Sequence, residues 1–101
     1  MAREITWTES ATDDLAEIAN YIGKDSEFYA AAIVRDLIAA SRSLSFLAER
    51  GRIVPEHRDP TVRQLLVRDY RLVYEVGESF VNILRIVHGS RTLPSLSTRL
   101  P

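Results

Sequence analysis

The chain has 101 residues, of which 46% are hydrophobic and 27% are charged, a balance typical of one soluble globular domain and not of a disordered segment. It has no cysteine, which excludes disulfides, thiolate metal sites and thiol nucleophiles. The first 50 residues hold five Lys/Arg and nine Asp/Glu, whereas the rest hold eight Arg and five Asp/Glu, so the net charge of −1 divides into −4 and +3. This total argues against broad polyanion binding, and the asymmetry predicts two faces with different partners.

The N-terminus has no signal-peptide pattern, and no apolar run approaches the roughly 20 residues of a membrane helix. We therefore expect a cytoplasmic protein.

The N-terminal half predicts one short strand, over residues 3–7, and then two helices. Thr8 or Ser10 can cap the first helix, and Gly23 ends it. Asp25 or Ser26 begins the second helix, which ends before Gly51, and the short connection predicts an antiparallel helical hairpin. Apolar residues recur at helical spacing in both helices: Ala11, Leu15, Ile18, Ala19 and Ile22 in the first, and Tyr29, Ile33, Leu37, Ala40, Leu44 and Leu47 in the second.

The C-terminal half predicts strands. A short extended piece over residues 52–55 precedes strands at Val62–Val67, Tyr70–Val76 and Phe80–His88, which short turns join into an antiparallel meander. The predicted fold class is α+β, with an N-terminal strand, an antiparallel helical hairpin packed on one face of a mostly antiparallel sheet, and a C-terminal three-strand meander. We expect a single domain over residues 1–101, in which residues 94–101 form an extended tail.

Several short motifs occur in a fixed order along the chain. They are Trp7, DL at 14–15, IANYI at 18–22, GRIV at 51–54, VRQL at 62–65, YRLVY at 70–74 and ILRIVHGSR at 83–91. Each motif alone is weak, but their order and spacing, from Trp7 to about Leu93, closely resemble the ParE-like members of the RelE/ParE toxin superfamily. The family fold is the same helical hairpin on an antiparallel sheet that the periodicity predicts.

This resemblance implies the toxin of a bacterial type II toxin–antitoxin pair, which arrests growth when free. It implies a cognate antitoxin, a small ParD-like DNA-binding protein, and we expect that partner to cover an apolar strip between the helical hairpin and the sheet. ParE-like members are associated with inhibition of DNA gyrase, whereas RelE-like members cut messenger RNA on the ribosome.

RelE-like nucleases resemble one another in a basic cluster: lysines before the YR strand, the arginine of YR, an arginine after the last strand, and often a tyrosine near the C-terminus. By position, Arg71 and Arg91 match the two arginines. The lysines are missing because Val62–Val67 reads VRQLLV, and the tyrosine is missing because the chain from Leu93 reads LPSLST. RNA cleavage also needs proton transfer and stabilisation of phosphorane charge, and His88 is the one evident group for the proton.

We therefore expect a gyrase-binding toxin without a cofactor or a metal, because His57 beside Glu56 has no metal spacing with other ligands. If the protein is a nuclease instead, its catalytic residues are Arg71, His88 and Arg91. A third possibility is a homologue without toxicity that serves as an antitoxin-binding or regulatory protein. The predicted contacts with target or antitoxin are Arg63, Arg71, Arg85, Arg91, Leu93 and Leu96.

Several of these residues also have structural interpretations. Arg71 can bridge Glu75 or an aspartate at the sheet surface, and Arg63 and Arg85 can be solvated side chains of the sheet. His88, at the end of a strand, is more often structural than catalytic. Core or core-edge packing is expected for Trp7, Tyr21, Tyr70 and Tyr74.

Overall fold

The computed structural model describes residues 2–91 and 93, and its elements follow the predicted order. These elements are β1 (Glu4–Trp7), α1 (Glu9–Gly23), α2 (Glu27–Ser43), β2 (Arg52–Ile53), β3 (Val62–Val67), β4 (Tyr70–Val76) and β5 (Phe80–His88). The strands form one five-stranded sheet in the order β1-β5-β4-β3-β2. Strand β1 pairs in parallel with β5, and the other pairs are antiparallel. The predicted α+β class and mostly antiparallel sheet are confirmed.

Hydroxyl side chains set where both helices begin. The Thr8 hydroxyl accepts a hydrogen bond from the backbone N–H of Ala11 at 3.0 Å, and the Ser26 hydroxyl accepts one from Tyr29 at 3.0 Å. Each bond satisfies one of the N–H groups that have no partner inside the helix. Of the predicted alternatives, Thr8 and Ser26 are therefore the N-caps.

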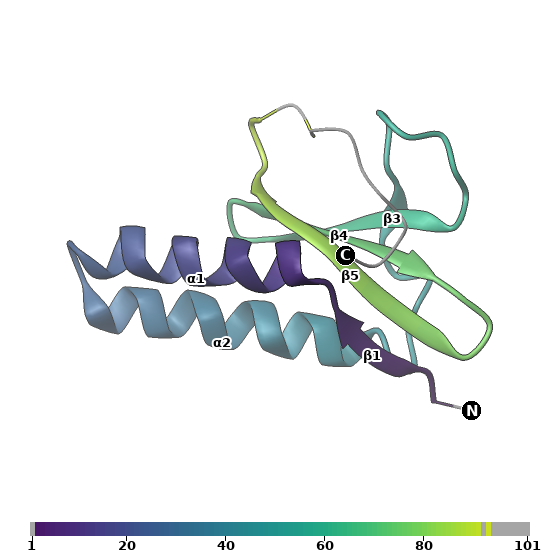
Figure 1. The fold of residues 1–101 in the computed structure, drawn as a ribbon, viewed down its shortest axis with the longest axis horizontal. Coiled ribbons are helices and arrows are strands. Elements are labelled where there is room, and N and C mark those ends of the chain that lie inside the picture. The colour runs from purple at the N-terminus through teal and green to yellow at the C-terminus, as the bar shows by residue number, and fades with distance from the viewer. Residues whose placement is uncertain (1, 92, 94–101) are drawn as a thin grey trace.

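The main core lies between the helical hairpin and one face of the sheet. In Figure 1 the two helices run side by side, and the turn that joins them lies at the end of the molecule away from the N-terminus. Small residues such as Ala30 and Ala32 are buried in α2, where they allow close packing. The larger buried side chains of this core are Ile33, Leu37, Leu44, Leu72, Tyr74, Val81, Ile83 and Ile86.

A second apolar cluster lies on the face of the sheet opposite the helices, which we call the open face. It consists of Val54, Val62, Val73, Leu84 and Leu93, with Val87 packed against it. Because neighbouring residues of a strand point to opposite faces, Arg71, Val73 and Glu75 project from β4 to the open face. The segment between β2 and β3 contributes Val54 to this cluster, and the chain after β5 contributes Leu93.

Three details of the predicted helices are wrong. Helix α2 ends at Ser43, because the chain turns at Leu44 and brings Leu44 and Ala48 into the core. Leu47 and Tyr29 are 57% and 44% exposed, so the core-facing stripe does not include them. Tyr21 is 73% exposed and is not a core residue.

The other predicted aromatic core residues are placed as expected. Tyr74 is fully buried, and Trp7 and Tyr70 are partly buried against the main core. No helix among residues 2–91 and 93 is long and apolar enough to cross a membrane.

Candidate functional site

Arg71 is held on the open face by a carboxylate from the segment between β2 and β3. Its Nη2 donates to Oε2 of Glu56 at 3.0 Å, and its Nη1 donates to the same oxygen at 3.2 Å and to Oε1 at 3.4 Å. The backbone N–H of Leu93 also donates to Oε2 of Glu56, at 3.1 Å. The Arg71 side chain is only 10% exposed, against 31% for Glu56. Three segments therefore meet at one carboxylate, and Arg71 bridges Glu56, not the predicted Glu75.

Two polar atoms of the sheet are buried without a hydrogen-bond partner among the described residues. They are the Nε of Arg71, a donor, and the Oε1 of Gln64, an acceptor. Gln64 faces Val73 across the β3–β4 pair, so its side chain lies on the open face as Arg71 does. Buried polar groups are nearly always paired, so this face has hydrogen-bonding capacity that the described part of the chain does not use.

His88 lies on the other side of the sheet from Arg71. Its ring makes an edge contact with Tyr70, with centroids 5.7 Å apart, and Tyr70 packs against the main core under the helices. The Ser90 backbone N–H donates to Nδ1 of His88 at 3.3 Å, and the Ser90 hydroxyl lies 2.7 Å from the same nitrogen. Because an N–H can only donate, Nδ1 is an acceptor here. The structure does not bring His88 and Arg71 together.

Arg85 is bound to helix α1. A β-bulge places Leu84 and Arg85 opposite the single residue Val73 of β4. The Nε and Nη2 of Arg85 donate to the carboxylate of Asp14 at 2.7 and 3.1 Å. The Ile86 N–H donates to the same carboxylate at 2.9 Å. These bonds hold Arg85 as a link between the sheet and α1, and the carboxylate raises its pKa.

The remaining predicted contact residues are spread over the molecule. Arg63 faces Tyr74 across the β3–β4 pair and donates to the Gly51 carbonyl at 2.9 Å. Arg91 is exposed in the turn after β5. Leu93 is buried in the open-face cluster, and Leu96 lies outside the described residues. The predicted set therefore does not form one basic patch, and Arg71 and Leu93 are the members that meet, through Glu56.

The acidic groups near the open face differ in their surroundings. The Leu93 N–H is the main cause of a lowered pKa for Glu56, to which the Arg71 charge adds. Burial raises the pKa of Glu75, and the charge of Asp59 raises it further. On the open face, the ionised form of Glu56 beside Arg71 is therefore favoured. The ionised form of Glu75, at the other end of β4, is disfavoured.

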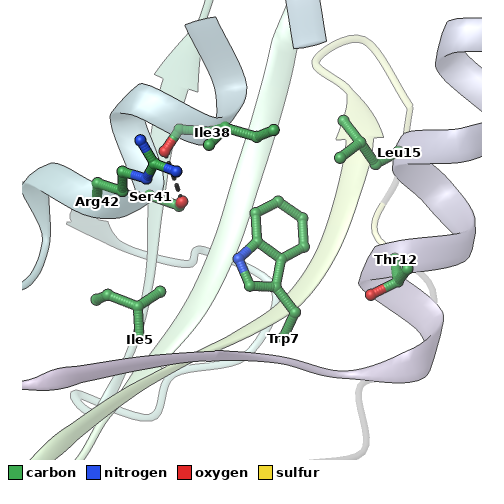
Figure 2. A pocket seen from close by; sticks show the side chains of 7 residues that line it. All are labelled: Ile5, Trp7, Thr12, Leu15, Ile38, Ser41 and Arg42. Atoms are coloured by element: carbon green, nitrogen blue, oxygen red, sulfur yellow. Dashed lines mark hydrogen bonds between the residues drawn. The ribbon is translucent and has the colours of Figure 1, made fainter. Parts of the chain in front are cut away.

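A groove of about 310 Å³ opens between β1 and the two helices. Figure 2 shows the Trp7 indole standing between Leu15 of α1 and the α2 residues Ile38, Ser41 and Arg42. Strand β1 is an edge of the sheet, since β5 is its one neighbour in the described strand order. This groove matches the predicted apolar strip between hairpin and sheet. Its other lining residues are Ile5 and Thr12.

Glu56 and Asp14 are the residues that the sequence did not reveal as partners of the arginines. Glu56 lies 15 residues before Arg71, and Asp14 lies 71 residues before Arg85. No helical or strand periodicity connects positions so far apart.

Among the described residues, no group of three or more His, Asp or Glu side chains is arranged to hold a metal ion.

Comparison with known proteins gives concordant matches in sequence and in fold. A family model described as the ParE toxin of the type II toxin–antitoxin system parDE matches residues 5–93. The chain is 36% identical over 89 residues to Toxin RelE2 of Caulobacter vibrioides, which covers 87% of this chain and 97% of that protein.

Two solved structures share the fold. A chain of the chromosomal ParDE system from P. aeruginosa superposes with a TM-score of 0.71 and 26% identity, covering 86% of this chain and 96% of that one. A chain of the toxin–antitoxin complex RelBE2 from Mycobacterium tuberculosis superposes with a TM-score of 0.61 and 25% identity, covering 87% and 92%.

Proposed function

Because this chain belongs to the ParE toxin family of type II toxin–antitoxin systems, within the RelE/ParE superfamily, we propose that it arrests growth by binding and blocking DNA gyrase in the cytoplasm. In this proposal the toxin acts by holding its target, without turnover of a substrate. A cognate ParD-like antitoxin neutralises it.

The observation that carries the proposal is the state of Arg71. Its guanidinium is nearly buried and already neutralised by Glu56. A cation that must stabilise the developing charge of a scissile phosphate has to face that phosphate without a competing anion. His88, the evident proton-transfer group, points to the opposite face of the sheet. This arrangement supports a binding protein over a nuclease.

The antitoxin half of the proposal rests on the groove beside β1. Apolar side chains line much of it, and next to it lies an edge of β1 with which no other described strand pairs. This combination suits a wrapping peptide or helix. The two solved relatives described above come from a ParDE toxin–antitoxin system and a RelBE2 toxin–antitoxin complex. We expect Trp7→Ala to weaken antitoxin binding, because it removes the largest side chain that lines the groove.

The direct experiment is a supercoiling assay with purified gyrase and purified toxin. The proposal predicts loss of supercoiling with free toxin and recovery on addition of the antitoxin. Unchanged supercoiling at a large molar excess of folded toxin would remove gyrase as the target.

A RelE-like ribosome-dependent endoribonuclease is the second candidate function. It is favoured by the likeness to a protein named Toxin RelE2, and by the exposure of His88 and Arg91, which are separated by only two residues. Incubation with translating ribosomes tests it: message cleavage that is lost in Arg71→Ala would establish this activity. A third candidate, a non-toxic antitoxin-binding homologue, predicts tight antitoxin binding without growth arrest on overexpression.

A further inference from the structure

The donors around Glu56 converge on one oxygen position. Oε2 of Glu56 accepts from both terminal nitrogens of Arg71 and from the Leu93 backbone N–H, at 3.0 to 3.2 Å. Oε1 has one contact, at 3.4 Å, and the Nε of Arg71 has none among the described residues. A buried guanidinium and a backbone N–H that point at one oxygen make a binding site for a carboxylate oxygen. The Nε of Arg71 is a further donor that no described residue uses.

The side chain that fills this site comes from a segment outside the sheet. Glu56 lies in the connection between β2 and β3, and its side chain is 31% exposed, whereas the Arg71 side chain on β4 is 10% exposed. The receptor is therefore built on the sheet, and its occupant is carried by a loop. Loops leave their native positions at lower cost than central strands.

The surroundings of Arg71 favour a particular kind of occupant. Across the sheet, Arg71 lies between Leu66 of β3 and Val87 of β5, which share its face. Leu66 is 65% exposed. A carboxylate that entered this site on a peptide would thus have an apolar surface beside it for a neighbouring side chain.

We propose that the open face carries a carboxylate-exchange site, in which an Asp or Glu side chain of a partner peptide replaces Glu56 on Arg71 and the Leu93 N–H. The exchange keeps the charge and the hydrogen bonds of the site, so the arginine is never left buried without an anion. The incoming peptide segment has an acidic residue next to an apolar one, and the apolar side chain covers Leu66. Glu56 is then an internal stand-in that keeps the site filled in the free protein.

A phosphate of a nucleic acid fits these surroundings less well. Glu75 and Asp59 lie near the same face, and Asp59 already raises the pKa of Glu75. A polyanion brought to this face would meet both of them together with the displaced Glu56, whereas a single carboxylate adds one charge only. The site therefore favours an acidic peptide over a phosphodiester.

The test uses the free full-length protein and does not depend on gyrase. The Nε–Hε signal of Arg71 is followed by NMR in the wild type, in Glu56→Ala and in the isosteric Glu56→Gln. The ligands are acetate, then a blocked tripeptide with glutamate between two leucines, and its glutamine counterpart. In wild type Glu56 competes as a tethered ligand, so we expect binding to be roughly tenfold tighter in the Glu56 variants. Asp36→Asn, which breaks the exposed pair with Arg68, is the matched control and should bind as the wild type does.

Saturable shifts of the Arg71 signal with acetate and the glutamate peptide, and none with the glutamine peptide, would support the proposal. It is overturned if folded Glu56→Gln shows no response to either carboxylate ligand. It is also overturned if inorganic phosphate or a short RNA moves the signal and the glutamate peptide does not. Should Glu56→Ala fail to fold, Glu56→Gln decides, because its side chain keeps the size of glutamate but has no charge with which to compete for Arg71.

Discussion

At the scale of single residues, two glutamates near the open face have pKa values that move in opposite directions. The Leu93 N–H and Arg71 lower the pKa of Glu56 from its ordinary 4.5, so its carboxylate adds stability above that pH and loses it as the pH falls. Burial and Asp59 raise the pKa of Glu75. The protonated Glu75 side chain therefore contributes its full stabilisation of the fold below the ordinary pKa of 4.5. This stabilisation is lost as the pH rises through the raised pKa.

Glu75→Gln should therefore stabilise the fold more at neutral than at acidic pH, because it removes a carboxylate whose ionisation is disfavoured. Chemical denaturation at about pH 4 and about pH 7 measures this difference. Glu56→Gln is the control with the opposite sign, since it should cost more stability at the higher pH. A gain from Glu75→Gln that is equal at both pH values would show that the ionisation of Glu75 does not matter.

The ion pair of Asp14 and Arg85 is expected to matter for stability. The Asp14 side chain is 12% exposed and accepts from Arg85 and from the Ile86 N–H. Asp14→Ala leaves these donors without their partner, and we expect a loss of about 2–3 kcal/mol in thermal or chemical unfolding. Asp36→Ala breaks the exposed pair with Arg68 and should cost less than about 1 kcal/mol. Equal losses in the two variants would contradict the structural role given to Asp14.

At the scale of elements, Tyr74 fastens the chain after α2 to strand β4. Its hydroxyl donates to the Ala48 carbonyl at 2.8 Å and accepts from the Gly51 N–H at 2.9 Å. A side chain at Gly51 would lie 2.4 Å from the Gln64 carbonyl oxygen and 2.6 Å from the Tyr74 hydroxyl. The position therefore requires glycine for close approach of two backbones. It does not end helix α2, because that helix already ends at Ser43.

Tyr74→Phe should destabilise the fold by about 1–3 kcal/mol, because a buried N–H and a buried carbonyl lose their partner while the ring stays in place. Equilibrium urea unfolding gives the value. An unchanged slope of the unfolding free energy against urea concentration would show that unfolding exposes the same amount of surface in both proteins. A loss below about 0.5 kcal/mol would mean that other groups satisfy both atoms.

Element types and order follow from the sequence because periodicity and capping act over a few residues. Thr8 and Ser26 stand directly before helical patterns, and β3 to β5 alternate as strands do. The predicted end of α2 is wrong, because the apolar spacing continues to Leu47 although the chain turns after Ser43. Spacing alone does not distinguish a longer helix from a turn that sends Leu44 and Ala48 into the core.

At the scale of the whole molecule, the sheet divides the predicted functional residues between its faces. Arg71 belongs to the open face with Glu56 and Leu93, while His88 contacts Tyr70 on the side of the helices. The motif positions single out the YR arginine, Arg71, and the late arginine, Arg91, as candidates for contact with a partner. The sequence could not predict that Glu56 neutralises Arg71, because that pairing depends on how the segment between β2 and β3 folds over the open face.

The most direct measurement for the proposed mechanism is gyrase supercoiling as a function of the molar ratio of toxin to gyrase, with message cleavage followed on translating ribosomes in parallel. A toxin that works by holding its target should abolish supercoiling near equimolar amounts and leave messages intact. Undiminished supercoiling in excess toxin, together with cleavage of many messages by each toxin molecule, would contradict the mechanism proposed here.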